Sequence, residues 1–431
     1  MVKGKWKILI ASLVGSAIEW FDYFLYGTVA SLVFNQLFFV NEDPTVGLLI
    51  AYTSFALAFF LRPVGGIIFS HIGDRLGRKK TLVLTLSLMG IATFGMGVMP
   101  TYQVIGIWAP IFLTLLRFIQ GLALGGEWGG SVLLAVEYAS KNNRGFFGSV
   151  PQMGISLGLI LGTLALSIMS LLPHDQFMSW GWRVPFLLSA LLVIFGLWIR
   201  KGIDETPAFK KAQQEGEVAK IPLVDTLRYH WKEVLIAMGA KVVETAPFYI
   251  FGTFIVSYAT STLNFDNTDA LNAVLIGSIV ATIVIPLVGS LSDRIGRKTI
   301  YISGIILTIL YAFPYFWMLQ QNSVFLLILA TVIGLGVIWG SVNAVLGTMI
   351  SEIFSAKVRY TGISLGYQLG AAVAGGTAPL IATALLVELF NNSYIPVAIY
   401  IIFAALISFI AIWSVKDGAN RELNDKVQIK A

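Results

Sequence analysis

Runs of about twenty apolar residues recur along the chain, for example over residues 81–99 and 395–415. Folded as an α-helix, each run is long enough to cross the ~30 Å hydrocarbon core of a bilayer. Of the 431 residues, 57% are hydrophobic and only 12% are charged, whereas soluble domains average ~45–50% and ~25%. The sequence therefore predicts an all-α membrane protein that crosses the bilayer many times.

The alternation of apolar and polar segments predicts twelve transmembrane helices. The expected helices cover residues 8–37, 46–72, 81–100, 104–138, 146–172, 183–200, 232–262, 270–291, 299–319, 323–353, 360–390 and 393–415. We expect four parts: a six-helix bundle over 1–200, a cytoplasmic linker over 201–231, a second six-helix bundle over 232–415 and a cytoplasmic tail over 416–431.

Lys and Arg residues are concentrated in the segments expected on one side of the membrane. Of the 29 Lys and Arg residues, Arg62, Arg117 and Lys241 fall inside helices and Arg183 lies at the outer mouth of the sixth. The other 25 lie in the tails and in alternate loops, which is the pattern of cytoplasmic segments. We expect a multi-pass protein of a prokaryotic inner membrane with both termini in the cytoplasm. The net charge of +6 then reports topology, and no nucleic-acid partner is expected.

The two halves of the chain repeat one another. The motif Asp-Arg-x-Gly-Arg-Lys occupies residues 74–79 and recurs at 293–298, 219 residues later. A second acid–base pair with a seven-residue spacing also recurs, at an offset of 215, as Glu137–Arg144 and Glu352–Arg359. Parallel repeats of this kind are typical of transporters that rock around a site near the bilayer midplane.

The repeated loop resembles the signature loop of the major facilitator superfamily, because it stands in the corresponding place of both halves. Five further motifs resemble the metabolite:proton symporter family, which includes carriers of shikimate, α-ketoglutarate, citrate and proline/betaine. They are Glu-Trp-Phe-Asp-Tyr at 19–23, Phe-Leu-Arg-Pro at 60–63, Gly-Gly-Glu-Trp-Gly-Gly at 125–130, Ser-Trp-Gly-Trp-Arg-Val-Pro at 179–185 and Val-Arg-Tyr-Thr-Gly at 358–362. Residues 177–200 and 241–244 look most similar to the shikimate-type branch. The resemblance implies the major-facilitator fold and proton-coupled import by alternating access.

Charges inside the expected helices indicate where the chemistry lies, since a single one costs ~2.5–3.5 kcal/mol at a helix centre. There are seven of them: Glu19, Asp22, Arg62, Arg117, Glu127, Lys241 and Glu244. A proton-driven carrier needs a carboxylate whose proton affinity responds to burial and to a nearby cation. We expect Asp22 or Glu127 to carry the proton, with Glu19 third. Glu127 follows Arg117 on one face of its helix, and that arginine is its expected neighbour. The alternative is that the charges form structural ion pairs, above all Lys241 with Glu244.

The cations suggest how a substrate is held. Arg62 and Arg117 carry permanent, bidentate charges suited to a carboxylate. Further polar and aromatic candidates for substrate binding, besides Lys241 and Glu244, are Tyr26, Gln120, Trp128, Gln152, Tyr249, Trp339, Asn343 and Gln368.

The repeated charges predict a cytoplasmic gate. A carboxylate at the end of a helix can pair with an arginine or with a helix end across the two bundles. The expected gate residues are Asp74, Arg75, Arg78, Glu137, Arg144, Asp293, Arg294, Arg297, Glu352 and Arg359.

No constellation of an enzyme, metal site or cofactor site stands out. The chain has no cysteine, its three histidines lack ligand spacing, and no phosphate-binding Gly-Lys-Ser/Thr loop is present. We expect a monomeric symporter that imports a small carboxylate-bearing metabolite with protons across the lipid bilayer. A proline/betaine importer is the alternative, with Trp20, Trp128 and Trp339 as a cage for a quaternary amine. A drug/proton antiporter, a sensor or a channel is less favoured.

Overall fold

The computed structural model describes residues 2–40, 44–202, 204–214, 222–355, 357–375 and 393–413, together with residues 378, 381, 382, 385 and 415. Within this part the secondary structure is helical and no strand is formed. The predicted tail over 416–431 and much of the predicted helix over 360–390 lie outside the described residues.

The first half of the chain forms six long helices joined by short turns. The long helices are α1 (Val2–Val29), α3 (Pro44–Leu76), α4 (Arg78–Val98), α6 (Trp108–Tyr138), α7 (Arg144–Met169) and α9 (Arg183–Lys201). The short elements are η1 (Ala30–Phe34), α2 (Asn35–Leu37), α5 (Tyr102–Ile105), η2 (Lys141–Asn143), α8 (His174–Gln176) and η3 (Phe177–Gly181).

Two short helices, α10 (Pro207–Gln214) and α11 (Pro222–Tyr229), lead into a second set of long helices. Two of them are made of several consecutive elements. The first consists of α12 (Trp231–Tyr249), η4 (Ile250–Phe254), α13 (Ile255–Ser257) and η5 (Tyr258–Thr262), and the second consists of α16 (Val324–Thr331), η6 (Val332–Trp339) and α17 (Gly340–Ile353). The others are α14 (Asn267–Ile295), α15 (Arg297–Leu319), α18 (Arg359–Ala374) and α20 (Ile395–Trp413).

Ten helical segments in the described part are long and apolar enough to cross a membrane. They match ten of the twelve predicted helices, and the other two correspond to α3 and α18. The apolar runs therefore predicted the all-α, membrane-spanning architecture because helices satisfy their own backbone groups where water is absent.

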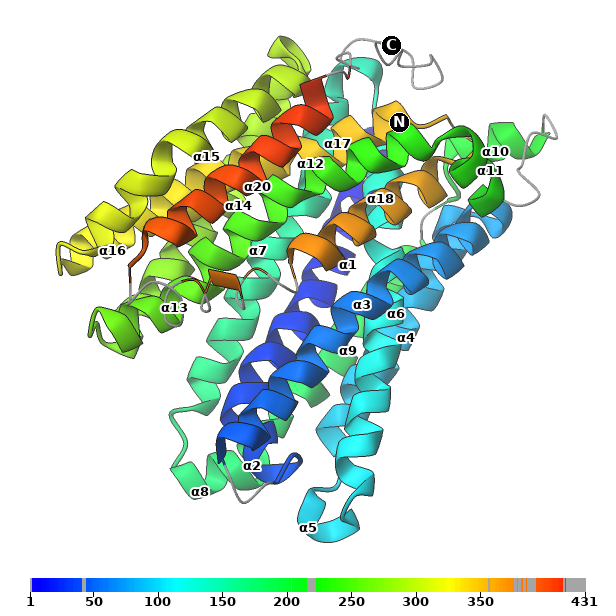
Figure 1. Cartoon of the computed structure of the whole chain (residues 1–431). Coiled ribbons are helices and arrows are strands. Elements are labelled where there is room, and N and C mark those ends of the chain that lie inside the picture. Colours follow the sequence, from blue (N-terminus) through cyan, green and yellow to red (C-terminus); the bar gives the residue numbers. More distant parts are fainter. Residues whose placement is uncertain are drawn as a thin grey trace.

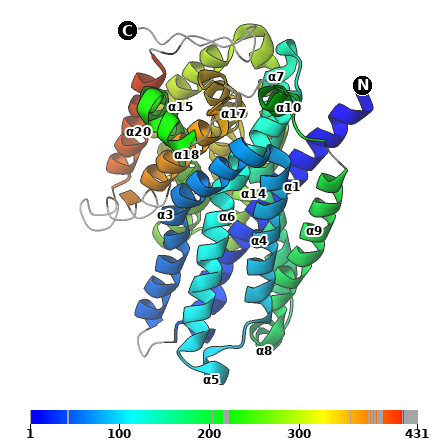
Figure 2. The ribbon, with the colours of Figure 1, turned by 90° about the vertical axis from the view of Figure 1, so that its right-hand side faces the viewer.

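The long helices form two bundles that meet at one end of the molecule. Figure 1 shows the start of α1 and the end of α20 at this shared end, here called the terminus end. From there the bundles diverge, one toward α2, α5 and α8 and the other toward α13 and α16 (Figure 1). In Figure 2, the helices of the first bundle run together toward α5 and α8. Contacts between the bundles join α7 to α14 and α17, and α3 to α18.

The repeated motif makes the same turn in both halves. Gly77 and Gly296 have φ of 110° and 97°, a region that glycine adopts without steric cost. Each glycine ends one long helix and allows the next to start at the following residue. Arg78 and Arg297 then fold back, and each donates to a carbonyl oxygen of the preceding helix, at 3.2 and 3.3 Å. The sequence repeat is therefore also a structural repeat.

Helices α1 and α7 cross closely through glycines of α7. A Cβ atom on Gly158 would lie 2.5 Å from the Cβ of Trp20 and 2.6 Å from the backbone nitrogen of Phe21. On Gly162, one turn further on, a Cβ atom would come no nearer than 3.6 Å to any neighbour. The two positions thus share a helix and a residue type but differ in the space around them.

We expect Gly158→Ala to destabilise the protein and Gly162→Ala to be neutral or slightly stabilising. Overpacking costs about 1–3 kcal/mol, whereas alanine is about 0.5–1 kcal/mol better than glycine inside a helix. The apparent unfolding temperature of each purified variant in detergent checks this. Equal shifts for the two variants would contradict the proposed close crossing.

Candidate functional site

Eight charged side chains are buried inside the two bundles, apart from the charges at the terminus end. This central set comprises Glu19 and Asp22 of α1, Arg62 of α3, Arg117 and Glu127 of α6, Arg200 of α9, and Lys241 and Glu244 of α12. None is more than 3% exposed. Seven of the eight are those that the sequence singled out, and four acids face four bases.

Arg200 is the member that the sequence did not identify. It ends an apolar run beside Lys201 and was therefore assigned to the positive loops. In the structure its guanidinium forms an ion pair with Glu127, which also accepts from Thr85 Oγ1 at 2.6 Å and Ser131 Oγ at 3.1 Å. The one signal for a further buried base was the count of four buried acids against three bases in the sequence, since an unpaired buried charge is costly.

The expectation that Glu127 lies beside Arg117 needs correction. Arg117 Nη1 instead donates to Gln120 Oε1 at 2.8 Å, and the guanidinium lies over the ring of Tyr26 at 4.2 Å. The two residues are ten positions apart on α6, so the cation of another helix, Arg200, reaches Glu127 first. Tyr26 itself is buried and shares a hydrogen bond of 2.7 Å with Ser54.

A hydrogen-bond chain connects Arg117 to Asp22. Gln120 Nε2 donates to Thr93 Oγ1 at 2.7 Å, and Thr93 Oγ1 donates to Asp22 Oδ2 at 2.8 Å. Ser189 Oγ donates to the other oxygen of Asp22 at 2.5 Å. Asp22 is therefore held by two hydroxyl groups inside the first bundle.

Arg62 is buried among three aromatic side chains of the first bundle. Its guanidinium carbon lies 4.4 Å from the ring centres of Tyr23 and Phe59 and 5.4 Å from that of Trp20. Its Nε and Nη2 have no hydrogen-bond partner among the described residues, and neither has either carboxylate oxygen of Glu19. The cation is thus stabilised by ring faces, while its N–H donors remain available to an acceptor.

The second bundle contributes an ion pair that is already satisfied. Lys241 Nζ contacts Glu244 and lies 3.8 Å from the ring centre of Tyr367. Thr245 Oγ1 donates to the Glu244 carboxylate at 2.9 Å, and Trp339 Nε1 donates to the Glu244 backbone oxygen at 2.8 Å. This geometry favours a structural ion pair between Lys241 and Glu244, which was one of the two interpretations that the sequence left open.

Aromatic contacts also join the bundles near Arg62. The ring of Tyr249 from α12 lies 5.7 Å from that of Phe59, and the rings of Phe24 and Phe248 lie 6.0 Å apart. Tyr249 therefore approaches the aromatic surroundings of Arg62 from the second bundle.

A layer of polar contacts, here called the floor, crosses between the bundles. Trp128 Nε1 donates to Gln152 Oε1 at 2.7 Å, and Gln152 Nε2 donates to Asn343 Oδ1 at 2.8 Å. Trp128 stacks on Tyr367 with ring centres 3.3 Å apart, and Gln368 Nε2 donates to the Gly125 carbonyl at 3.0 Å. Four predicted substrate ligands therefore bind one another or the backbone in this conformation.

At the terminus end, an aspartate of each bundle caps a helix of the other. Asp293 accepts from the backbone N–H groups of Gly145 and Phe146 at 2.8 and 3.0 Å. Asp74 accepts from the backbone N–H of Thr361 at 3.0 Å and from its hydroxyl at 2.9 Å. Both sites use the free N–H groups and the positive dipole end of a first helical turn.

Ion pairs complete this gate. They are Arg78 with Asp74 at 3.2 Å and with Glu137 at 3.6 Å, Arg359 with Glu137 at 3.7 Å, Arg144 with Glu352 at 3.5 Å, and Arg297 with Asp293 at 2.8 Å and with Glu352 at 3.5 Å. Arg75 and Arg294, which were also predicted as gate residues, are exposed instead. Each follows its aspartate by one position. Because successive residues of an α-helix point in different directions around its axis, the aspartate faces the interface and the arginine faces solvent.

The linker adds a residue that the sequence did not single out. Glu205 accepts from the backbone N–H groups of Arg78 and Lys79 at 3.0 and 3.2 Å, so it caps the start of α4. Tyr138 Oη donates to the Glu205 backbone oxygen at 3.0 Å. Glu205 follows Asp204 in a polar linker and belongs to no repeated motif, so the sequence gave no pattern from which this role could be predicted.

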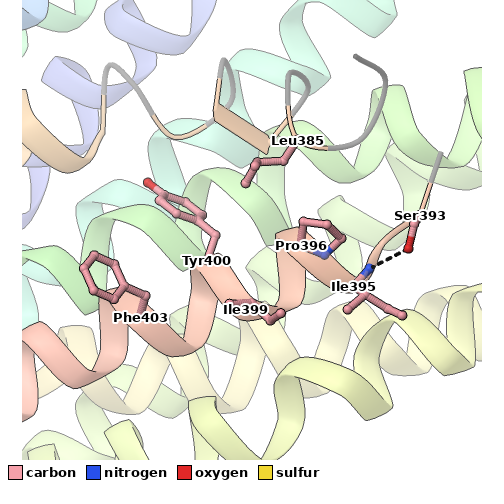
Figure 3. A pocket seen from close by; sticks show the side chains of 7 residues that line it. All are labelled: Leu385, Ser393, Ile395, Pro396, Ile399, Tyr400 and Phe403. Carbon is pink, nitrogen blue, oxygen red and sulfur yellow. Dashed lines mark hydrogen bonds between the residues drawn. The ribbon is translucent and has the colours of Figure 1, made fainter. Parts of the chain in front are cut away.

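The open groove in Figure 3 lies apart from these charges, along the start of α20. It is lined by Leu385, Ser393, Ile395, Pro396, Ile399, Tyr400 and Phe403. Ile395, Ile399 and Phe403 are 48–61% exposed. An apolar, outward-facing groove on a membrane-spanning helix is suited to contact with lipid and offers no chemistry for a polar substrate.

The sequence matches the family described as Major Facilitator Superfamily over residues 12–372 and 237–428. It is 40% identical to a shikimate transporter of Escherichia coli K12 over 414 residues, which cover 95% of this chain and 94% of that protein. It is 34% identical to a proline/betaine transporter of Salmonella typhimurium, covering 97% of this chain and 84% of that protein. The fold is similar to that of the proton:xylose symporter XylE bound to 6-bromo-6-deoxy-D-glucose, with a TM-score of 0.76, 19% identity and 98% of both chains covered.

We expect Asp293→Ala to open the terminus end, because it removes the acceptor of two backbone N–H groups on the other bundle. A hydrogen bond to a charged group contributes about 1.5–3 kcal/mol, which is roughly a ten- to hundred-fold change in the closed-to-open ratio. The chain has no cysteine, so Ser149→Cys, buried beside Gly289, provides a single reporter whose maleimide labelling should accelerate.

Arg294→Gln is the matched control, since it alters the neighbouring exposed residue and should leave labelling of the reporter unchanged. Equal labelling in the Asp293→Ala and unsubstituted backgrounds would mean that the aspartate does not hold this end closed.

We expect Arg200→Gln and Glu127→Gln each to destabilise the protein, because each leaves an unpaired buried charge. Removing one partner of a buried pair costs about 3–5 kcal/mol. The double variant should recover part of the loss in apparent unfolding temperature. Additive losses in the double variant would show that the two side chains do not act as a pair.

Proposed function

The chain belongs to the major facilitator superfamily, and on that premise we propose that it imports a small carboxylate-bearing metabolite together with protons. Shikimate or a keto or hydroxy acid is the substrate class that we propose, and alternating access of the two bundles is the mechanism. The relatives include a shikimate transporter and an inner membrane metabolite transport protein, both of Escherichia coli K12, which supports this class over the other substrates of the superfamily.

The observation that carries the proposal is the state of Arg62. Its guanidinium is 2% exposed, stacked among aromatic rings, and keeps two nitrogen atoms without an acceptor. A buried donor without a partner costs about 1–3 kcal/mol, and more when it is charged. A substrate carboxylate would remove this cost by accepting two parallel hydrogen bonds, which is the geometry that arginine favours.

The aromatic residues support a carboxylate more than a quaternary amine. A betaine headgroup needs open ring faces, but the faces of Trp20, Tyr23 and Phe59 already surround the guanidinium of Arg62. A proline/betaine importer remains the second candidate, because a relative of that kind is 34% identical and the carboxylate of betaine could also bind Arg62.

We further propose that the terminus end faces the cytoplasm and that one chain is the working unit. The alternate positive loops support this orientation. The gate and the floor tie the bundles together at that end, while the bundles diverge at the other (Figure 1).

The test is uptake into proteoliposomes under an inward proton gradient. Labelled shikimate, α-ketoglutarate, citrate, proline and glycine betaine would each be supplied with and without a protonophore. We expect accumulation of a carboxylic acid that collapses with the protonophore. Accumulation of glycine betaine or proline alone would overturn the carboxylate proposal and favour the second candidate.

We expect Arg62→Gln to weaken the affinity for the transported acid roughly ten- to hundred-fold, because one charge-assisted interaction contributes about 1.5–3 kcal/mol. The half-saturating concentration for counterflow measures this. Arg75→Gln, on the same helix but exposed, should leave it unchanged. An unaltered half-saturating concentration in Arg62→Gln would remove this residue from the substrate site.

A further inference from the structure

Resting on the proposed function, we propose that Glu19 carries the coupled proton and that each single-carboxylate substrate travels with one proton, so that transport is electroneutral. The argument begins with the charge balance of the central set. Its four acids and four bases sum to zero when all are ionised, and none is more than 3% exposed. A net charge in such a low-dielectric interior is unfavourable.

Glu19 differs from the other three acids of this set. Glu127 is paired with Arg200, Glu244 with Lys241, and Asp22 accepts from two hydroxyl groups. Both oxygens of Glu19 are buried without a hydrogen-bond partner in the described part of the chain. An ionised carboxylate without donors is poorly stabilised, so Glu19 is the acid of this set best placed to take up a proton.

The neighbours of Glu19 give its charge one compensating cation. Glu127, Arg62, Arg200 and Asp22 all interact with it electrostatically, as does Tyr367 of α18. Because Arg200 is bound to Glu127, Arg62 is the cation that remains to balance Glu19. These two side chains come from different helices, α1 and α3, and each keeps unpartnered polar atoms.

The space between Glu19 and Glu127 supplies no further donor to Glu19. Its other lining residues are Thr85, Leu86, Met89, Ala123 and Leu124. Thr85, the polar member of that lining, donates to Glu127. The two carboxylates line the same small space and repel each other, and they can both stay ionised only while cations compensate them.

Substrate binding changes this compensation. When a substrate carboxylate binds Arg62, its negative charge cancels the cation that balances Glu19. Glu19 then binds a proton from the outer solution, one O–H bond forms, and the site is neutral again. On the cytoplasmic side the same O–H bond breaks and the proton leaves with the substrate.

The first measurement uses the unsubstituted full-length chain in proteoliposomes, with labelled shikimate as the probe. A pH gradient without a membrane potential should drive accumulation. An inside-negative potential, set with potassium and valinomycin without a pH gradient, should not. Accumulation driven by the potential alone would overturn electroneutral transport. The absence of counterflow for every carboxylate in the panel would instead overturn the proposed function itself, and this inference with it.

The second measurement compares Glu19→Gln with Asp22→Asn, one turn away on the same helix. We expect Glu19→Gln to keep counterflow, in which no net proton movement is needed, and to lose accumulation driven by the pH gradient. Loss of counterflow in a folded Glu19→Gln variant would identify Glu19 as a substrate ligand and overturn the proposal. Retained accumulation in Glu19→Gln, or its loss in Asp22→Asn alone, would also overturn it.

Discussion

The structure depends on one constraint, which is that a charge buried among membrane-spanning helices must meet an opposite charge or a dipole. Two separate sets of buried charges obey it. The central set pairs Glu127 with Arg200 and Glu244 with Lys241. The gate balances four acids against four arginines at the terminus end. Because buried pairs are at best weakly stabilising compared with apolar packing, these fifteen buried charges and the partly buried Asp293 are explained better by function than by stability.

The contacts of the gate are of kinds that can separate when the two bundles move apart. Its two aspartates bind first-turn N–H groups of the opposite bundle, and these groups can bond to water once the bundles separate. Several of its ion pairs have N–O distances of 3.5–3.7 Å, longer than a charge-assisted hydrogen bond of ~2.7–2.9 Å. The long pairs that join the two bundles, Arg144 with Glu352 and Arg359 with Glu137, can separate when the bundles move against each other.

Sequence alone predicted the helices, the repeat and most of the buried charges, because each has a one-dimensional signal. Hydropathy marks a span, a shared offset marks a repeat, and a charge within an apolar run marks a site. The partners of those charges had no such signal. Arg117 and Glu127 share a helix, but the rotation of α9 that brings Arg200 to Glu127 is fixed by packing. For the same reason the exposed Arg75 and Arg294 could not be separated from the buried arginines of the same motif.

The floor connects the gate to the site of Arg62. Along α6, Arg117, Trp128 and Glu137 follow one another from the central set to the gate, and Trp128 joins both bundles through Gln152 and Tyr367. Opening the terminus end must therefore break the floor and the gate together, at a cost of several hydrogen bonds of about 0.5–3 kcal/mol each. A substrate can shift this balance only through contacts that differ between the two states. Tyr249 of the second bundle packs on Phe59, whose ring also contacts Arg62, so a ligand seated on Arg62 would lie close to a surface that moves relative to it. Under our proposal for Glu19, neutralising the site with a proton would allow that movement without carrying an unbalanced charge through the membrane interior.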